Sequence, residues 1–247
     1  MASSGNHLTL GIIPARWGST RFPGKPLHVI AGKPLVQHVW ERAQQCKGLD
    51  KVIIATDDER IYEASSKFGA QVVMTSPDHP TGTDRIAEAA SSCPNAQYII
   101  NIQGDEPLIE PGLIDQLAEA LKADSAISMA TAANPITDDE AMNDPNVVKC
   151  VIAGNGDALY FSRSPIPYRR EESPGLSLYR HKGIYAYRKD FLEEFVTWQP
   201  SPLELAESLE QLRALENNAR IKVLITEDES TGVDTLEQAQ QMEHLLS

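Results

Sequence analysis

Short apolar runs alternate with segments of helical spacing along the first half of this chain, and that alternation limits its possible folds more than any other feature. The β-branched runs fall at residues 8–13, 52–55, 71–74, 98–102 and 126–131. Most segments between them carry apolar residues every three or four positions, which predicts helices. Strands that alternate with helices predict a mostly parallel sheet with helices on both faces. We therefore expect an α/β fold of three layers.

Several local signals place the ends and faces of the predicted helices. Asp58 and Asp84 stand where helix-capping residues are expected, and Pro111 before Gly112 marks a helix start after a loop. A closing helix is expected from Asp234 to Leu246. Two apolar faces should pack on the sheet, one formed by Leu35, Val39, Ala43 and Cys46 and the other by Leu113, Leu117 and Leu121.

The second half of the chain has a different pattern. After about Pro135 the alternation weakens, and the stretch from Ser162 to Arg180 is rich in proline and charge. Such a stretch predicts a long excursion from the sheet, of the kind that often binds ligands or forms dimer contacts. A chain of 247 residues suits one substantial core. We expect a single domain over residues 1–247, with residues 148–215 as a smaller lobe within it.

Charge and cysteine content exclude several classes of function. The net charge of −13 argues against a nucleic-acid partner, since phosphate backbones are held by basic patches. Cys46, Cys93 and Cys150 are widely spaced, which favours buried thiols in a reducing compartment over disulfides or zinc. The first residues, up to Gly11, contain no Lys or Arg ahead of an apolar run, so they do not resemble a secretory signal. No later stretch approaches the roughly 20 apolar residues of a membrane span. We expect a cytoplasmic protein without membrane insertion.

A cationic loop follows the first predicted strand, where open α/β sheets bind ligands. Arg16, Arg21 and Lys25 place three cations within ten residues of an acidic chain. Gly18 and Gly24 permit close backbone approach, so the loop suits a triphosphate. Its spacing is not that of a Walker A loop, and the chain has no G-x-G-x-x-G fingerprint, which makes a dinucleotide enzyme a poor candidate. The alternative is an ordinary solvated basic turn.

Two aspartates are candidates for holding a divalent cation. Asp105 follows the predicted strand at 98–102, and magnesium needs only one or two carboxylates when phosphates and water complete its shell. Asp234 follows the apolar run at 221–225 through an acidic loop. The residues alone favour a helix N-cap for Asp234, because it precedes Thr-Leu-Glu.

Two further segments could contribute to a polar pocket. Residues 81–85 open a helix whose first amides could meet an anion or a base edge, although capping by Thr83 or Asp84 is an equal alternative. Residues 181–187 read as a strand on which His181 and Tyr185 face the same way. A lone histidine is more often structural than catalytic, and the sequence near His181 shows no nucleophile for it to serve.

Together these segments resemble the CMP-KDO synthetase family, the 3-deoxy-manno-octulosonate cytidylyltransferases, over nearly the whole chain. The resemblance rests on ordered motifs rather than on one match, with Thr81 as a small departure where serine is expected. The motifs are Ile13-Pro-Ala-Arg16 continuing through Ser19, Arg21, Pro23, Gly24, Lys25, Pro26 and Leu27, then residues 81–85, 101–107, 181–185 and 232–235.

The resemblance implies a fold of the nucleotide-diphospho-sugar transferase type and a role for each matching residue. CTP is assigned to Ala15, Arg16, Ser19, Arg21, Lys25, Gly82 and Asp105. The sugar acid is assigned to Arg85, Gln103, His181, Tyr185, Glu210 and Gln211. Magnesium is assigned to Asp105 and Asp234, and catalysis to Lys25, Arg21, Asp105 and Asp234. From the residues alone, Glu210 and Gln211 are simply polar helix positions.

The resemblance implies magnesium-dependent transfer of CMP from CTP to the anomeric hydroxyl of 3-deoxy-D-manno-octulosonate (KDO), with pyrophosphate released, for lipopolysaccharide biosynthesis. It also implies a homodimer built partly from residues 162–187. A related enzyme, such as a CMP-sialic acid synthetase or one using UTP, is the nearest alternative. A non-catalytic nucleotide-binding module is another, because fold alone does not fix function.

Overall fold

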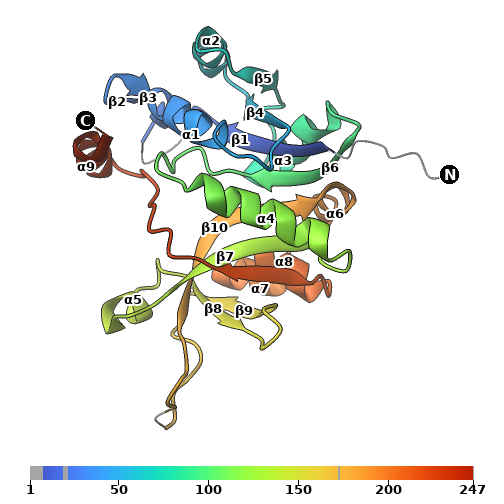
Figure 1. Ribbon diagram of the computed structural model, residues 1–247, viewed down its shortest axis with the longest axis vertical. Helices are drawn as coiled ribbons and strands as arrows, with labels where there is room; N and C mark the ends of the chain where they lie inside the picture. The colour runs from blue at the N-terminus through green and yellow to red at the C-terminus, as the bar shows by residue number, and fades with distance from the viewer. Residues whose placement is uncertain (1–7, 19–21, 172, 247) are drawn as a thin grey trace, which may run out of the picture. The chain divides into compact units, whose positions relative to one another are not determined.

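The computed structural model describes residues 8–18, 22–171 and 173–246 and divides the chain into two compact units (Figure 1). Unit 1 comprises residues 1–118 and 230–247, and unit 2 comprises residues 119–229. The predicted lobe at 148–215 lies inside unit 2, and its separate status stays a prediction. Each unit has its own set of paired strands.

Unit 1 contains a parallel sheet with the order β6-β1-β4-β5. Its strands are β1 (Leu8–Ala15), β4 (Lys51–Thr56), β5 (Gln71–Met74) and β6 (Ala96–Asn101). Ile12 and Ile13 are both fully buried, as are Ile53 and Ile54. Neighbouring residues of a strand point to opposite faces, so both faces of this sheet are covered. The predicted α/β fold with a mostly parallel sheet is confirmed.

Side-chain caps mark the starts of several helices of unit 1. They are α1 (Leu35–Ala43), α2 (Glu59–Lys67), α3 (Gly82–Ser91), α9 (Leu236–Leu246) and the start of α4 (Pro111–Ala123). Asp58 caps α2 as predicted, by accepting from Arg60 N. Asp84 also caps a helix as predicted, but from the third helical position: Thr81 is the N-cap of α3, and the Asp84 carboxylate accepts from Thr81 N in a capping box.

A small apolar cluster joins the two separate segments of unit 1. The short strands β2 (Val29–Ile30) and β3 (Lys33–Pro34) form a hairpin against which α9 packs. Ile30 and Leu35 are buried with Val233, Ala239 and Met242. Burying this cluster fixes the C-terminal segment to the N-terminal one.

Unit 2 is mostly antiparallel. Its strands are β7 (Met129–Pro135), β8 (Lys149–Ile152), β9 (Ala158–Ser162), β10 (Tyr179–Arg188) and β11 (Ile221–Ile225). β7 pairs with β10 in the antiparallel sense and with β11 in the parallel sense, while β8 pairs antiparallel with both β10 and β9. Its helices are α5 (Asp139–Asn143), α6 (Lys189–Phe195), α7 (Pro202–Glu207) and α8 (Gln211–Glu216).

Two sequence predictions for unit 2 have different outcomes. The strand predicted at 126–131 begins only at Met129, because Asp124 accepts from Ala126 N and Ile127 N in a turn. The excursion predicted between Ser162 and Arg180 is present, and between β9 and β10 no helix or strand forms in the described residues 163–171 and 173–178.

The remaining sequence predictions concern cysteines and the membrane. Cys46, Cys93 and Cys150 are free, the last two buried and Cys46 half-buried. Burial raises the pKa of the Cys150 thiol to about 12, so it stays protonated at neutral pH. Among the described helices, none has both the length and the apolar character needed to cross a bilayer.

Candidate active site

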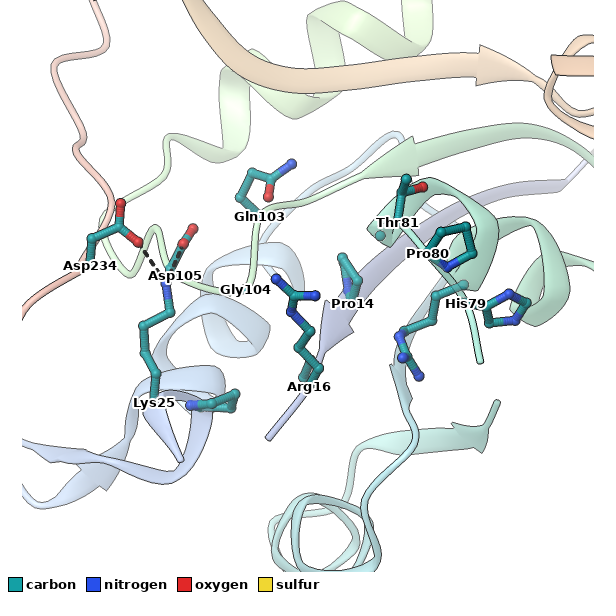
Figure 2. A pocket seen from close by; sticks show the side chains of 14 residues that line it. Pro14, Arg16, Lys25, His79, Pro80, Thr81, Gln103, Gly104, Asp105 and Asp234 are labelled. Atoms are coloured by element: carbon teal, nitrogen blue, oxygen red, sulfur yellow. Dashed lines mark hydrogen bonds and ion pairs between the residues drawn. The ribbon is translucent and has the colours of Figure 1, made fainter. Parts of the chain in front are cut away.

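A cavity of about 350 Å³ opens where the strands of unit 1 end (Figure 2). The segment after β1, the segment after β6 and the start of α3 line it, as expected for the carboxyl ends of parallel strands. Eight predicted site residues are among its lining: Ala15, Arg16, Lys25, Gly82, Arg85, Gln103, Asp105 and Asp234. Ser19 and Arg21 lie outside the described residues.

The Lys25 ammonium lies between the two predicted metal-binding aspartates. Its Nζ is 2.6 Å from Asp105 Oδ2 and 3.0 Å from Asp234 Oδ1. These partners are 80 and 209 positions away in sequence. The side chains of Lys25, Asp105 and Asp234 are 15%, 28% and 42% exposed, so ligands from solution can reach the aspartates. Figure 2 shows the three groups converging on one point.

Backbone contacts bring the two aspartates together. Val233 N donates to Asp105 O at 2.8 Å, which places the segment carrying Asp234 beside the loop after β6. Gly104 lets that loop approach β1, because a Cβ at this position would lie 2.8 Å from Pro14 O. The proximity of Asp105 and Asp234 is therefore a consequence of the packed backbone.

The N-cap role that the residues alone favoured for Asp234 belongs to its neighbour. Thr235 Oγ1 accepts from Gln238 N, and Gln238 Oε1 accepts from Thr235 N. This reciprocal pair is a capping box. The Asp234 carboxylate instead binds Lys25, because the turn before α9 directs it into the cavity.

The Lys25 loop is anchored at its described ends. Lys25 begins a short 3-10 turn (η1, Lys25–Leu27), preceded by Gly24 at a left-handed φ of 71°. Gly24 N donates to Trp17 O, and the Arg60 guanidinium lies 3.4 Å from the centre of the Trp17 ring. This cation–π contact and the turn fix the base of the Lys25 side chain.

The pair of aspartates fits a magnesium ion. Both carboxylates already converge on one cationic group, the Lys25 ammonium. Within the described residues, no cluster of three or more His, Cys, Asp or Glu side chains could hold a metal without other ligands. Magnesium commonly takes one or two carboxylates with substrate phosphates and water, so this donor set suits a metal that arrives with a nucleotide.

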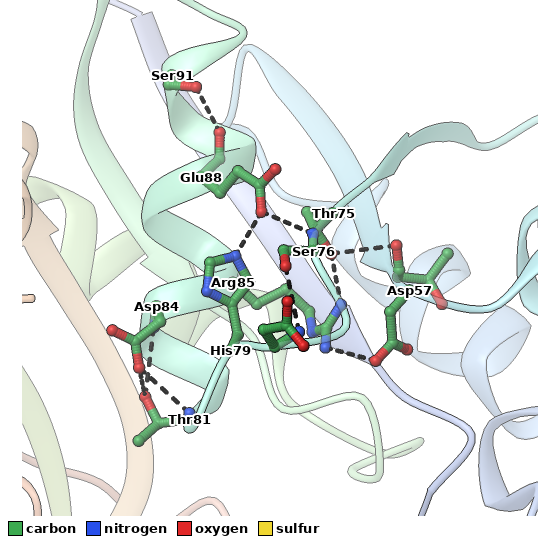
Figure 3. A network of polar contacts seen from close by, with 11 residues as sticks. Asp57, Thr75, Ser76, His79, Thr81, Asp84, Arg85, Glu88 and Ser91 are labelled. Carbon is green, nitrogen blue, oxygen red and sulfur yellow. Dashed lines mark hydrogen bonds and ion pairs between the residues drawn. The ribbon is translucent and has the colours of Figure 1, made fainter.

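Arg85 and Gln103 line the same cavity, and Arg85 has protein partners (Figure 3). Its guanidinium donates to Asp57 Oδ2 at 2.8 Å and to Thr75 Oγ1, and its side chain is 4% exposed. Binding a substrate carboxylate in two places would require Arg85 to share donors with Asp57. Its assignment to the sugar acid stays a prediction.

The other predicted sugar-acid residues lie in unit 2. The rings of His181 and Tyr185 are 5.4 Å apart, which agrees with their predicted position on one face of a strand. Burial and the nearby Glu210 charge raise the pKa of Tyr185, so its hydroxyl remains a hydrogen-bond donor. Gln211 is buried, and its Nε2 has no hydrogen-bond partner among the described residues. A buried donor without a partner is a feature that a ligand could satisfy.

Comparison with known proteins agrees with this arrangement. A family model described as "Cytidylyltransferase" matches residues 10–221. The 3-deoxy-manno-octulosonate cytidylyltransferase of Solibacter usitatus is 52% identical over 236 residues, covering 96% of this chain and 93% of the relative. That of Geobacter sulfurreducens is 53% identical over 234 residues, covering 91% and 93%.

The chain belongs to the 3-deoxy-manno-octulosonate cytidylyltransferase family. It is therefore an enzyme, and the resemblance found in its motifs is confirmed. A solved structure of CMP:2-keto-3-deoxy-manno-octonic acid synthetase complexed with CTP is 43% identical with a TM-score of 0.92, covering 97% of this chain and 98% of that one. A 4-diphosphocytidyl-2C-methyl-D-erythritol synthase from Anaerococcus prevotii, 14% identical with a TM-score of 0.64, shares the fold alone.

Motif analysis did not single out every residue that shapes this cytidylyltransferase. His79 and Pro80 line the cavity, and His79 pairs with Glu88. Asp57 and Thr75 position Arg85. The sequence signal for Asp57 was its place two residues beyond the predicted strand at 52–55, much as Asp105 lies three residues beyond that at 98–102. His79 lies in a loop without such a signal.

We expect His181 to make this family member less stable in mild acid. Burial lowers the pKa of His181 to about 3 from an unfolded value of 6.5. Between these values the unfolded chain binds a proton that the folded chain does not, so stability must fall as pH falls from 6.5. The contribution is at most about 1.4 kcal/mol per pH unit. Urea unfolding of wild type and His181→Asn from pH 7 to about 5 measures it. Equal slopes for the two proteins would contradict the prediction.

Proposed function

We propose that the chain catalyses magnesium-dependent transfer of CMP from CTP to the anomeric hydroxyl of KDO, giving CMP-KDO and pyrophosphate for lipopolysaccharide biosynthesis. The observation that carries the proposal is the convergence of Lys25, Asp105 and Asp234 in a cavity at the strand ends. The likeness to a synthetase structure complexed with CTP supports the choice of nucleotide. The names of the relatives support the choice of sugar acid.

The proposed reaction is an in-line displacement at the α-phosphorus of CTP. The anomeric oxygen forms the new bond to the α-phosphorus, and the bond from that phosphorus to the oxygen bridging the α- and β-phosphates breaks. The electron pair of the broken bond leaves with pyrophosphate, and the hydroxyl proton leaves to solvent. Such a reaction asks the protein mainly to position its substrates and neutralise charge. Arg16 and Lys25, with Arg21, supply cations beside the triphosphate. No side-chain base is required by this scheme.

Asp105 and Asp234 would hold the magnesium ion. When bound, such an ion offsets phosphate charge and lowers the pKa of a bound hydroxyl. Lys25 then has two sets of anionic partners, the aspartates in the ligand-free protein and the phosphates of bound CTP. We propose that its ammonium moves from the first set to the second when the nucleotide enters.

For the sugar acid we propose Arg85, Gln103, His181, Tyr185, Glu210 and Gln211. Glu210 is held in place by Arg213, whose Nη2 lies 3.3 Å from Glu210 Oε1. Arg213 also pairs with Glu204 and is itself nearly buried. A carboxylate fixed in this way can accept hydrogen bonds from sugar hydroxyls without first losing side-chain entropy.

A cytoplasmic homodimer is also proposed. The resemblance implies dimer contacts within residues 162–187, and in this region Tyr168 is 88% exposed. Large exposed apolar side chains in an excursion from a sheet suit a contact with a second copy. Light scattering on the purified protein measures its oligomeric state directly. A mass of one chain across the working concentration range would contradict the proposed homodimer.

The function is tested by supplying CTP or UTP with KDO or a sialic acid, in magnesium, and measuring pyrophosphate release. We expect turnover only with CTP and KDO, and mass spectrometry should identify CMP-KDO as the product. Chelation of the metal should abolish turnover. Pyrophosphate release from CTP with sialic acid, but not with KDO, would favour a CMP-sialic acid synthetase. Tight CTP binding without pyrophosphate from any sugar acid would favour a non-catalytic module.

A further inference from the structure

The strand β10 carries a bulge next to His181. Lys182 pairs with Ala132 of β7, but Tyr185 pairs with Thr131, the very next β7 residue. Gly183 and Ile184 are therefore two additional residues on β10. Bulges interrupt the ladder and redirect side chains, and they are frequent beside active sites. Because two residues are added rather than one, His181 and Tyr185 remain on one face of the strand, with their rings 5.4 Å apart.

The buried Thr131 hydroxyl fills the gap that the bulge makes. Its Oγ1 lies 2.7 Å from Ile184 O, 3.2 Å from Lys182 O and 2.9 Å from His181 Nε2. Carbonyl oxygens can only accept hydrogen bonds, and a hydroxyl has a single hydrogen. That hydrogen therefore points to the carbonyls, with Ile184 O as the nearer acceptor. The contact with His181 must then use a lone pair of Oγ1, so the donor is Nε2–H.

We infer that Thr131 is a positioning residue that holds His181 as the Nε2–H tautomer, leaving Nδ1 as an acceptor for a hydroxyl of the sugar acid. The identity of that ligand rests on the proposed function. His181 is partly exposed, and its Nδ1 has no hydrogen bond from the described residues. The rings of Phe161 and Tyr185 flank the imidazole at 5.0 and 5.4 Å, which restricts its rotation.

Burial supports the same assignment. It lowers the pKa of His181 to about 3, so the ring is neutral at neutral pH. A neutral imidazole has one donor and one acceptor nitrogen, and the hydrogen bond at one nitrogen decides which proton the other carries. A protonated ring would offer two donors and could not accept from a sugar hydroxyl. Thr131 therefore determines what the exposed side of His181 can recognise.

The test compares Thr131→Val, which keeps the shape but removes the hydroxyl, with Thr131→Ser, which keeps it. ¹⁵N spectra of histidine-labelled protein report the tautomer, and His181→Gln identifies the His181 signals. We expect a protonated Nε2 in wild type and in Thr131→Ser, and a mixture of tautomers in Thr131→Val. The KM for KDO should rise about tenfold in Thr131→Val, equivalent to about 1.4 kcal/mol. The KM for CTP should stay within about twofold of wild type, because none of the residues proposed to bind CTP is altered.

Thr197→Val is the matched control, since Thr197 is exposed just beyond α6 and its hydroxyl donates, among the described residues, only to Glu194 O. A protonated Nδ1 in wild type, an unchanged tautomer in Thr131→Val, or equal rises in both KM values would overturn the inference. So would a failure of Thr131→Ser to restore the KM for KDO. If Thr131→Val does not fold, the wild-type and Thr131→Ser spectra still decide the tautomer. If wild type does not use KDO, the proposed function fails, while the spectra still test the role of Thr131.

Discussion

Replacing Asp105 by asparagine is expected to lower the turnover number for CMP transfer by about 10³-fold, the largest loss of any single substitution in the cavity. Asparagine has nearly the same shape, so its side-chain oxygen can still accept a hydrogen bond from Lys25, whose Nζ lies 2.6 Å from Asp105 Oδ2 in wild type. It removes the negative charge that a magnesium ion requires of its ligand. Steady-state pyrophosphate release at saturating CTP, KDO and magnesium measures the effect.

Asp234→Asn should cause a smaller loss, about 10²-fold. Its carboxylate is more exposed than that of Asp105 and lies farther from Lys25, so solvent screens its charge more. Asp139→Asn is the control, because Asp139 is highly exposed on α5 and is paired with Arg169 only at 3.4 Å. Thermal unfolding should confirm that all three variants fold. Turnover of Asp105→Asn within about threefold of wild type would remove this residue from the catalytic machinery.

Lys25→Met is expected to have opposite effects on turnover and on metal binding. Turnover should fall about 10²-fold, because a cation beside the triphosphate is lost. In the absence of nucleotide, however, the affinity for Mn²⁺ as a magnesium substitute should rise about tenfold, or about 1.4 kcal/mol. The reason is that the Lys25 ammonium pairs with both aspartates in the ligand-free protein and competes with any other cation there.

Calorimetric titration with Mn²⁺ separates these two roles of Lys25, because it does not depend on turnover. Lys33→Met is the matched control, since Lys33 lies on the hairpin of β2 and β3 and is paired with Glu41 of α1. The control should leave both turnover and Mn²⁺ affinity unchanged. An unchanged Mn²⁺ affinity in Lys25→Met would show that the ammonium does not occupy the position a metal would take. A loss of Mn²⁺ affinity would mean that Lys25 orders the aspartates instead.

Local patterns predicted much of unit 1. Strand and helix periods depend on near neighbours, so the strands β1, β4, β5 and β6 were predicted to within two residues at most of their ends. The positions of the cation loop and Asp105 followed from the same pattern, because ligand sites lie beyond the carboxyl ends of parallel strands. Predictions were poorer where a turn competed with a strand, as at residues 124–127 before β7.

Other features depend on contacts between distant segments. Asp234 is a good N-cap on local grounds, but the Val233 N to Asp105 O bond and the packing of α9 place it at Lys25. Thr235 then supplies the cap. Arg85 follows a helix start that local sequence suggests, yet its pairing with Asp57 depends on which strands are neighbours.

The amino-acid sequence by itself determined the α/β pattern, the family and the chemical types of the site residues, since periodicity and motif order are properties of the chain before it folds. Only the tertiary structure decided which charged groups pair and which donors and acceptors are left for a ligand. Lys25 lies between two aspartates because a long-range backbone hydrogen bond, from Val233 N to Asp105 O, brings their segments together. Thr131 contacts His181 because β10 carries a bulge. Distances of this kind are set by the burial of whole elements rather than by any local run of residues.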